Sequence, residues 1–147
     1  MTQAPASSLV AASVNPVNVA RAVLAEAAPD MITLAVADSD YRVHLVPTAP
    51  VSAEVGKRIR GVVRAQARRI DITQTGGRFI EPVYGRPRRI QGTIVAVDPG
   101  ADTVTVQVHD GFPIVCKTNG QQRAAEFKEG QFVGFDVAPG ATFTQTT

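Results

Sequence analysis

Residues 92–117 read GTIVAVDPGADTVTVQVHDGFPIVCK, and residues 20–45, ARAVLAEAAPDMITLAVADSDYRVHL, align with them without a gap at an offset of 72. Six of the 26 aligned positions are identical, where a chain rich in Ala and Val would give roughly two by composition. The identical pairs are Val23/Val95, Asp30/Asp102, Thr33/Thr105, Val36/Val108, Asp38/Asp110 and Val43/Val115. The alignment therefore predicts a small β-unit that occurs twice in the chain.

The second copy has the alternation of apolar and polar residues that is typical of β-strands. Val104, Val106 and Val108 fall on one face of an extended segment, and turns rich in Asp, Gly and Pro lie on either side of it. The expected strands are 90–97, 103–108, 112–117 and 131–137, with one or two helical turns over 121–127. This order of elements suits an OB-like or SH3-like barrel.

The first copy is ambiguous on its own. Residues 19–28, VARAVLAEAA, favour a helix on propensity, and Asn15-Pro16 could begin one. The alignment with the second copy favours a strand, which is our prediction. Residues 69–84 have no counterpart in the second copy, and we expect them to form a hairpin around Gly76-Gly77.

We predict an all-β protein built as a tandem of two duplicated barrels, or as two halves fused into one pseudo-symmetric barrel. A unit of about 70 residues can barely bury a core of its own, so the copies should pack together. The predicted parts are an Ala/Ser/Pro-rich arm over 1–17, a first repeat with the extra basic hairpin over 18–84, a basic linker over 85–91 and a second repeat over 92–147. The arm would need a surface to lie on, such as a neighbouring subunit.

Composition limits the environment of the protein. Cys116 is the single cysteine, so no internal disulfide is possible and we expect a reducing, cytoplasmic compartment. Cys116 lies in an apolar run, which favours a buried side chain over a nucleophile. The sequence contains no apolar run of 18 residues and no pattern of a secretory signal, so we expect no membrane association.

Charge is distributed unevenly along the chain. The net charge is −3 before Lys57, +8 over residues 57–89 and −3 after residue 89. If residues 57–69 form a strand, Arg58, Arg60, Arg64, Gln66 and Arg68 lie on one face, and Ile59, Gly61, Val63, Ala65 and Ala67 lie on the other. A helix would also align Arg60, Arg64 and Arg68, so the basic stripe does not depend on the assignment.

This basic segment is the candidate binding surface. Side chains two residues apart on one strand face lie about 6.6 Å from each other, which is comparable to the spacing of phosphates along an extended single strand. Guanidinium groups bind phosphate in a bidentate manner. The predicted polyanion-binding residues are Arg58, Arg60, Arg64, Arg68, Arg69, Arg86, Arg88 and Arg89. A solvated strand face that balances the acidic flanks is the alternative.

Two short segments resemble elements of known families. Residues 84–89, Tyr-Gly-Arg-Pro-Arg-Arg, resemble the AT-hook, which implies binding in the minor groove of A·T-rich DNA, although Tyr84 stands where a basic residue is expected. Asp71-Ile-Thr73-Gln-Thr-Gly76 is similar to the Asp-x-Ser-x-x-Gly element of PilZ domains, which implies cyclic di-GMP, with Thr in place of Ser. We assign the first segment as a linker and the second as a turn.

Nothing in the sequence favours catalysis. It has no Walker loop, no nucleophile signature beside either His, and no Cys/His cluster for a metal. We therefore expect no cofactor and no enzyme activity. The first functional hypothesis is a non-catalytic module that binds a polyanion, with nucleic acid as the first candidate. The second is a structural protein that self-assembles into a homo-oligomer through its charge-complementary repeats and its N-terminal arm.

Overall fold

The computed structural model describes residues 14–146, and most of this part of the chain lies in β-strands. The first half contains β1 (Val19–Ala28), β2 (Met31–Ala35), β3 (Arg42–Pro47), β4 (Arg58–Gln66), β5 (Asp71–Ile72), β6 (Phe79–Glu81) and β7 (Tyr84–Gly85). The second half contains β8 (Arg89–Asp98), β9 (Thr103–His109), β10 (Phe112–Lys117), β11 (Phe132–Asp136) and β12 (Thr142–Gln145). Two short 3-10 turns, η1 (Pro16–Asn18) and η2 (Ala124–Glu126), complete the described elements.

The prediction of an all-β protein is confirmed. Residues 19–28 form strand β1 and not a helix, because their alternate side chains Ala20, Ala22 and Leu24 are buried against the core. The described residues contain no α-helix, and none of their helical turns is long and apolar enough to cross a membrane. Most of the predicted arm, residues 1–13, lies outside the described part of the chain.

The first half contains a closed, mixed barrel of five strands. β1, β2 and β3 form an antiparallel meander, and β4 returns antiparallel to β1. β12 closes the barrel between β3, to which it is parallel, and β4, to which it is antiparallel. Because β12 comes from the C-terminal end of the chain, the first half does not close this barrel with its own strands.

The second half repeats the same strand order. β8, β9 and β10 form an antiparallel meander, and β11 pairs antiparallel with β8. Here the extra edge comes from the first half, since the end of β4 runs parallel to β10, Ala67 bridges Val137, and β5 pairs with β11. Each half therefore receives a strand segment from the other.

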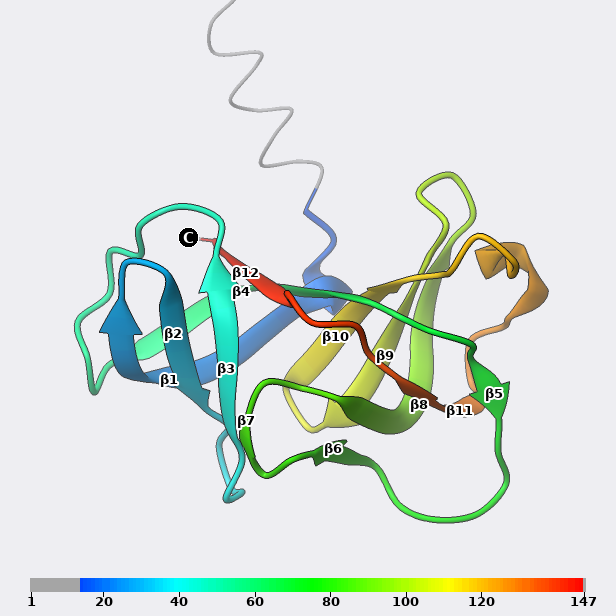
Figure 1. The fold of residues 1–147 in the computed structure, drawn as a ribbon, viewed down its shortest axis with the longest axis horizontal. Helices are drawn as coiled ribbons and strands as arrows, with labels where there is room; N and C mark the ends of the chain where they lie inside the picture. Colours follow the sequence, from blue (N-terminus) through cyan, green and yellow to red (C-terminus); the bar gives the residue numbers. More distant parts are fainter. Residues whose placement is uncertain (1–13, 147) are drawn as a thin grey trace, which may run out of the picture.

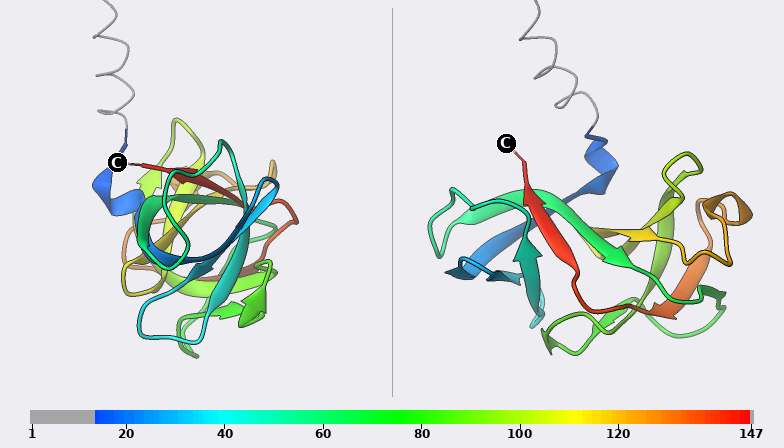
Figure 2. Two further views of the ribbon diagram at one scale, coloured as in Figure 1. Left: turned by 90° about the vertical axis from the view of Figure 1, so that its left-hand side faces the viewer. Right: turned by 45° about the horizontal axis from the view of Figure 1, so that its top comes forward.

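The two exchanged segments pass each other where the halves meet. Figures 1 and 2 show β4 and the β11–β12 stretch running side by side between the two lobes. At the crossing, Ala67 N donates to Lys117 O and Ala138 N donates to Gln66 O, both at 2.9 Å. Gly61 of β4 leaves room for the ring of Phe143 and the backbone of Thr144 from β12, where a Cβ would collide. All strands consequently belong to a single hydrogen-bonded sheet.

Hydrogen bonds at equivalent positions show how closely the halves match. In the first half Leu24 N donates to Lys57 O at 2.9 Å and Gly56 N donates to Leu24 O at 2.7 Å. In the second half Ile94 N donates to Gln131 O at 2.9 Å and Gly130 N donates to Ile94 O at 2.8 Å. Gly56 and Gly130 also share a left-handed conformation, with φ of 92° and 93°. The two halves therefore make the same backbone contacts around β1–β4 and β8–β11.

These registers correct the gapless alignment of residues 20–45 with 92–117. The first hairpin turns through Pro29 and Asp30, whereas the second turns through the four residues 99–102. Because the second turn is two residues longer, β1 and β8 correspond at an offset of 70. The strands after the turn, β2 and β9, correspond at the offset of 72. In the first half His44 lies opposite Thr33, and in the second half Val115 lies opposite Thr105. Because Thr33 and Thr105 correspond, His44 corresponds to Val115. The counterpart of Cys116 is therefore Leu45 and not His44. The alignment identified the right strands but missed differences in turn length and register.

The expected hairpin around Gly76-Gly77 is wrong. β5 pairs with β11 and β6 pairs with β8, so the strands on either side of the turn bind different neighbours. Gln91 of β8 is 8% exposed and holds the turn, because its Nε2 donates to Thr75 O at 3.3 Å and to Gly77 O at 3.0 Å. Residues 73–78 therefore lie across the sheet of the second half.

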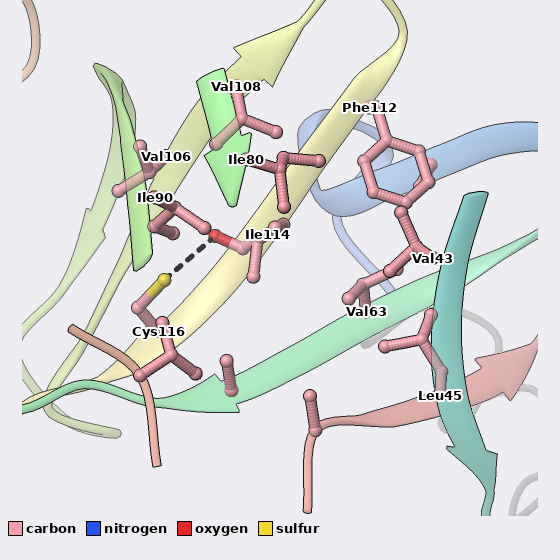
Figure 3. Close-up of a cluster of buried hydrophobic side chains, with 14 of the residues drawn as sticks. Val43, Leu45, Val63, Ile80, Ile90, Val106, Val108, Phe112, Ile114 and Cys116 are labelled. Carbon is pink, nitrogen blue, oxygen red and sulfur yellow. Dashed lines mark hydrogen bonds between the residues drawn. The ribbon is translucent and has the colours of Figure 1, made fainter. Parts of the chain in front are cut away.

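Both halves contribute to one hydrophobic core. Figure 3 shows Phe112 of β10 pointing toward Val43 and Val63 of the first barrel, and all three side chains belong to the same buried cluster. Cys116 is buried in this core, as the sequence predicts, and its thiol donates to Ile114 O at 3.5 Å. Burial raises the pKa of the Cys116 thiol well above its ordinary value.

We predict that the halves do not separate into folded fragments. A chain cleaved between Gly85 and Arg88 should remain one compact particle in size-exclusion chromatography, because each fragment supplies strands to the other. The separated fragments should each lose their β-sheet circular dichroism and regain it when mixed. Two fragments that stay folded after separation would contradict the strand exchange.

Candidate nucleic-acid interface

The predicted basic face of β4 is a strand face. Arg58, Arg60 and Arg64 are exposed, while Ile59, Val63 and Ala65 on the opposite face of the strand are buried in the core. The alternation breaks only at Val62, which is 3% exposed and lies between β1 and β12. The strand therefore presents its arginines to solvent because the core takes the other face.

The structure distributes the predicted arginines over two hollows. One, the β1–β4 hollow, has a volume of about 660 Å³ and is lined by Arg21, Ala22, Val23, Ala37, Arg58, Ile59, Arg60, Gln145 and Thr146. The other, the β6–β8 hollow, has a volume of about 850 Å³ and is lined by Arg68, Glu81, Pro82, Val83, Arg86, Pro87, Arg88, Arg89, Asp136, Val137 and Pro139. Arg64 and Arg69 line neither hollow. The eight residues therefore do not form one site.

Carboxylates neutralise two of the eight arginines. Arg69 Nε lies 3.0 Å from Asp71 Oδ1, and Arg89 Nη1 lies 3.1 Å from Asp136 Oδ1. The other six form no ion pair with any described residue. Arg64 donates to the hydroxyl of Thr144 at 3.3 Å, which leaves its charge uncompensated. Charge compensation therefore separates Arg69 and Arg89 from the rest.

Arg21 is a member of the basic surface that the sequence analysis missed. In the β1–β4 pairing it lies directly opposite Arg60, and Val23 lies opposite Arg58. Its N–H donates to Gly111 O at 2.9 Å and not to β4, so Arg21 and Arg60 form a non-hydrogen-bonded pair, in which side chains approach most closely. The alternation of apolar and polar residues in β1 would have predicted that Arg21 faces outward. Its position opposite Arg60 follows only from the β1–β4 register, which the sequence does not show.

The two hollows differ in electrostatic character. The β1–β4 hollow carries three guanidinium groups, those of Arg21, Arg58 and Arg60, and no carboxylate among its lining residues. Glu81 and Asp136 stand among the arginines of the β6–β8 hollow and offset part of their charge. Like charges on directly opposed residues of neighbouring strands destabilise a sheet, so the pair Arg21/Arg60 is costly without an anion. The β1–β4 hollow is consequently the more strongly basic of the two.

The backbone of residues 84–89 is held within the fold and is not a free segment like that of an AT-hook. Tyr84 and Gly85 pair with β3, Arg88 N donates to Glu81 O at 2.8 Å, and Pro87 is buried. Tyr84 is 59% exposed, and its ring meets His44 edge-on with the centroids 5.1 Å apart. Tyr84 is therefore available to contact a ligand, whereas the backbone of this segment is held by the fold.

The element that is similar to PilZ serves a structural role here. Asp71 is paired with Arg69, and Thr75 and Gly77 accept hydrogen bonds from Gln91. Among the described residues, no group of three His, Cys, Asp or Glu side chains is placed to hold a metal ion.

Comparison of the chain with protein-family models and with curated proteins gives no match.

We predict that the replacement R21E stabilises the protein. A carboxylate opposite Arg60 exchanges a repulsive pair for an attractive one, which should raise the free energy of unfolding by about 0.5–1 kcal/mol at low ionic strength. The gain should shrink in about 1 M salt, where the Debye length is short. Urea unfolding at both salt concentrations measures it.

The matched control for this prediction is K128E. Lys128 lies exposed in the turn before β11, so the change in net charge is the same but no arginine stands opposite. If R21E does not exceed K128E in stability at low salt, Arg21 and Arg60 do not repel each other.

Proposed function

We propose that this protein is a non-catalytic module that binds a polyanion, with nucleic acid as the first candidate. The observation that carries the proposal is the β1–β4 hollow, in which Arg21, Arg58 and Arg60 meet without a carboxylate. Like charges on opposed residues lower the stability of the folded protein, and an anionic ligand that binds between them removes this repulsion.

Phosphate is an anion that these residues suit. Each guanidinium can donate two parallel hydrogen bonds to a phosphate group. Arg58 and Arg60 are two residues apart on one strand face, which places them about 6.6 Å apart along the strand. Arg64 extends the same face toward the crossing, so the arginines follow a line and not a point. Such a line of cations supports a chain of phosphates.

The proposal predicts salt-dependent binding of DNA or RNA. The double variant R58Q/R60Q should weaken binding of a fluorescent oligonucleotide by about tenfold or more, because charge-assisted hydrogen bonds are lost. It should also reduce the slope of log K against log salt by about 1.4–1.8. Fluorescence anisotropy between about 50 and 200 mM salt measures both quantities.

The matched control is R69Q/R89Q. It removes the same charge from arginines that Asp71 and Asp136 already neutralise, so its effect on affinity and slope should be smaller. Absence of binding at the lowest salt, or affinity that does not fall as salt rises, would contradict the proposed function.

A self-assembling structural protein is the second candidate. Val83 and Tyr84 are adjacent and are 50% and 59% exposed. Val83 also lines the β6–β8 hollow together with Arg86 and Arg88. In this candidate function, these two arginines of the hollow pair with acidic residues of another copy. This candidate predicts a homo-oligomer whose mass falls as salt rises and when residues 1–17 are removed. Light scattering with the absorbance ratio at 260 and 280 nm distinguishes it: a nucleic-acid-free monomer at low salt excludes assembly.

The repeated registers support a common origin for the two halves. We infer that they arose by duplication of one small β-unit related to OB-like or SH3-like barrels, since β1–β4 and β8–β11 share strand order and backbone hydrogen bonds. The predicted boundaries at residues 18–84, 85–91 and 92–147 remain a proposal on this basis, except that residues 89–91 of the predicted linker belong to β8 and therefore to the second half. The exchanged segments would then derive from a pairing of two copies.

A further inference from the structure

The equivalence of the two halves allows the β1–β4 hollow to be compared with its counterpart. With β1 matched to β8 and β4 to β11 by their registers, Arg21 corresponds to Gln91, Arg60 to Gly134 and Arg58 to Phe132. The three cations of the first half are thus an amide, a hydrogen and an aromatic ring in the second. The same place in the fold carries two different chemistries.

In the second half this place is occupied by the chain itself. Thr73 N donates to Phe132 O at 2.8 Å, Gln91 donates to the carbonyls of Thr75 and Gly77, and Arg78 pairs with Asp110 at 3.0 Å. A Cβ on Gly76 would approach Gln91 Nε2 to 2.7 Å, so the segment lies tightly against the sheet. The turn formed by residues 73–78, between β5 and β6, fills the position.

In the first half no segment of residues 14–146 takes this position, and a hollow of about 660 Å³ remains. Its walls correspond to those around residues 73–78 in the second half. Gln145 and Thr146, at the end of β12, take the place of β5. Ala37 lies in the β2–β3 loop, which corresponds to the turn at Asp110. The hollow therefore lies where a single stretch of chain, the turn 73–78, packs on the second half.

We propose that the β1–β4 hollow binds one extended single strand of nucleic acid through its phosphates, in the position that residues 73–78 take in the second half. The inference rests on the proposed function and specifies its ligand. Arg21 stands where Gln91 binds two carbonyl oxygens, and it offers a guanidinium with five N–H donors in place of an amide with two. Arg58 and Arg60 supply the neighbouring charges.

Shape and charge favour a single strand over the other polyanions. The phosphates of a duplex lie on a convex, rigid surface and would reach mainly the rim of a hollow bordered by the end of β12 and the β2–β3 loop. An acidic peptide would fit the shape. A carboxylate and a backbone phosphate each present two oxygens to a guanidinium fork, so the preference rests on the line of arginines, which is the kind of cationic groove on which single strands bind sequence-tolerantly.

The test compares three ligands at one salt concentration by fluorescence anisotropy. They are an oligothymidylate of about 12 nucleotides, a duplex of the same length and a polyglutamate peptide of the same charge. The single strand should bind about tenfold more tightly than either rival. R21Q, which installs the residue of the second half, should weaken single-strand binding by about fivefold to tenfold and lower its salt slope by about 0.7.

K128Q is the control, since it removes one charge from the surface turn before β11. Equal affinity for the duplex or for polyglutamate, or equal effects of R21Q and K128Q on the single strand, would overturn this inference while leaving the polyanion function in place. Failure of every ligand to bind would overturn the proposed function itself. Circular dichroism of R21Q confirms that a loss of affinity is not a loss of fold.

Discussion

The antiparallel crossing of β4 and the β11–β12 stretch is the constraint on which the rest of the structure depends. Each segment begins in one half and ends as part of the other, and Ala67 and Val137 bridge where they pass. The barrel of the first half closes only through β12. The crossing needs small residues, and Gly61 provides the space for Phe143 to pack against β4. One shared core follows, because the strands that complete each half are continuous with the other.

The sequence predicts those features of the fold that depend on neighbouring residues, and it fails for those that depend on contacts between distant parts of the chain. Alternation along residues 103–108 and the turns beside it locate β9 correctly, since strand faces are a local property. Pairing partners are not local, so the sequence could not indicate that residues 142–145 close a barrel with β3 and β4. The supposed hairpin around Gly76-Gly77 failed for the same reason, because β5 and β6 find better partners in β11 and β8.

The candidate site shows the same division. The exposed face of β4 was predictable from the spacing of Arg58, Arg60 and Arg64, and the structure places them on one strand face. The ion pairs that neutralise Arg69 and Arg89 were not predictable: Asp136 is far from Arg89 in sequence, and Asp71, although close to Arg69, pairs with it only in this local geometry. Arg21 sits in a segment with a net negative charge, and only the β1–β4 register makes it part of the basic surface.

The asymmetry between the halves is informative because their backbones agree. Where registers and turn glycines coincide, a difference in side chains does not follow from the fold, since the second half builds the same strands with Gln91 and Gly134 in place of Arg21 and Arg60. The second half satisfies its face internally: Gln91 is 8% exposed and donates to the backbone of residues 75 and 77. The first half keeps opposed cations that an uncharged pair would replace at a gain in stability. The backbone does not require these charges, and they lie at the place that residues 73–78 occupy in the second half, which is why we propose this place as the binding surface.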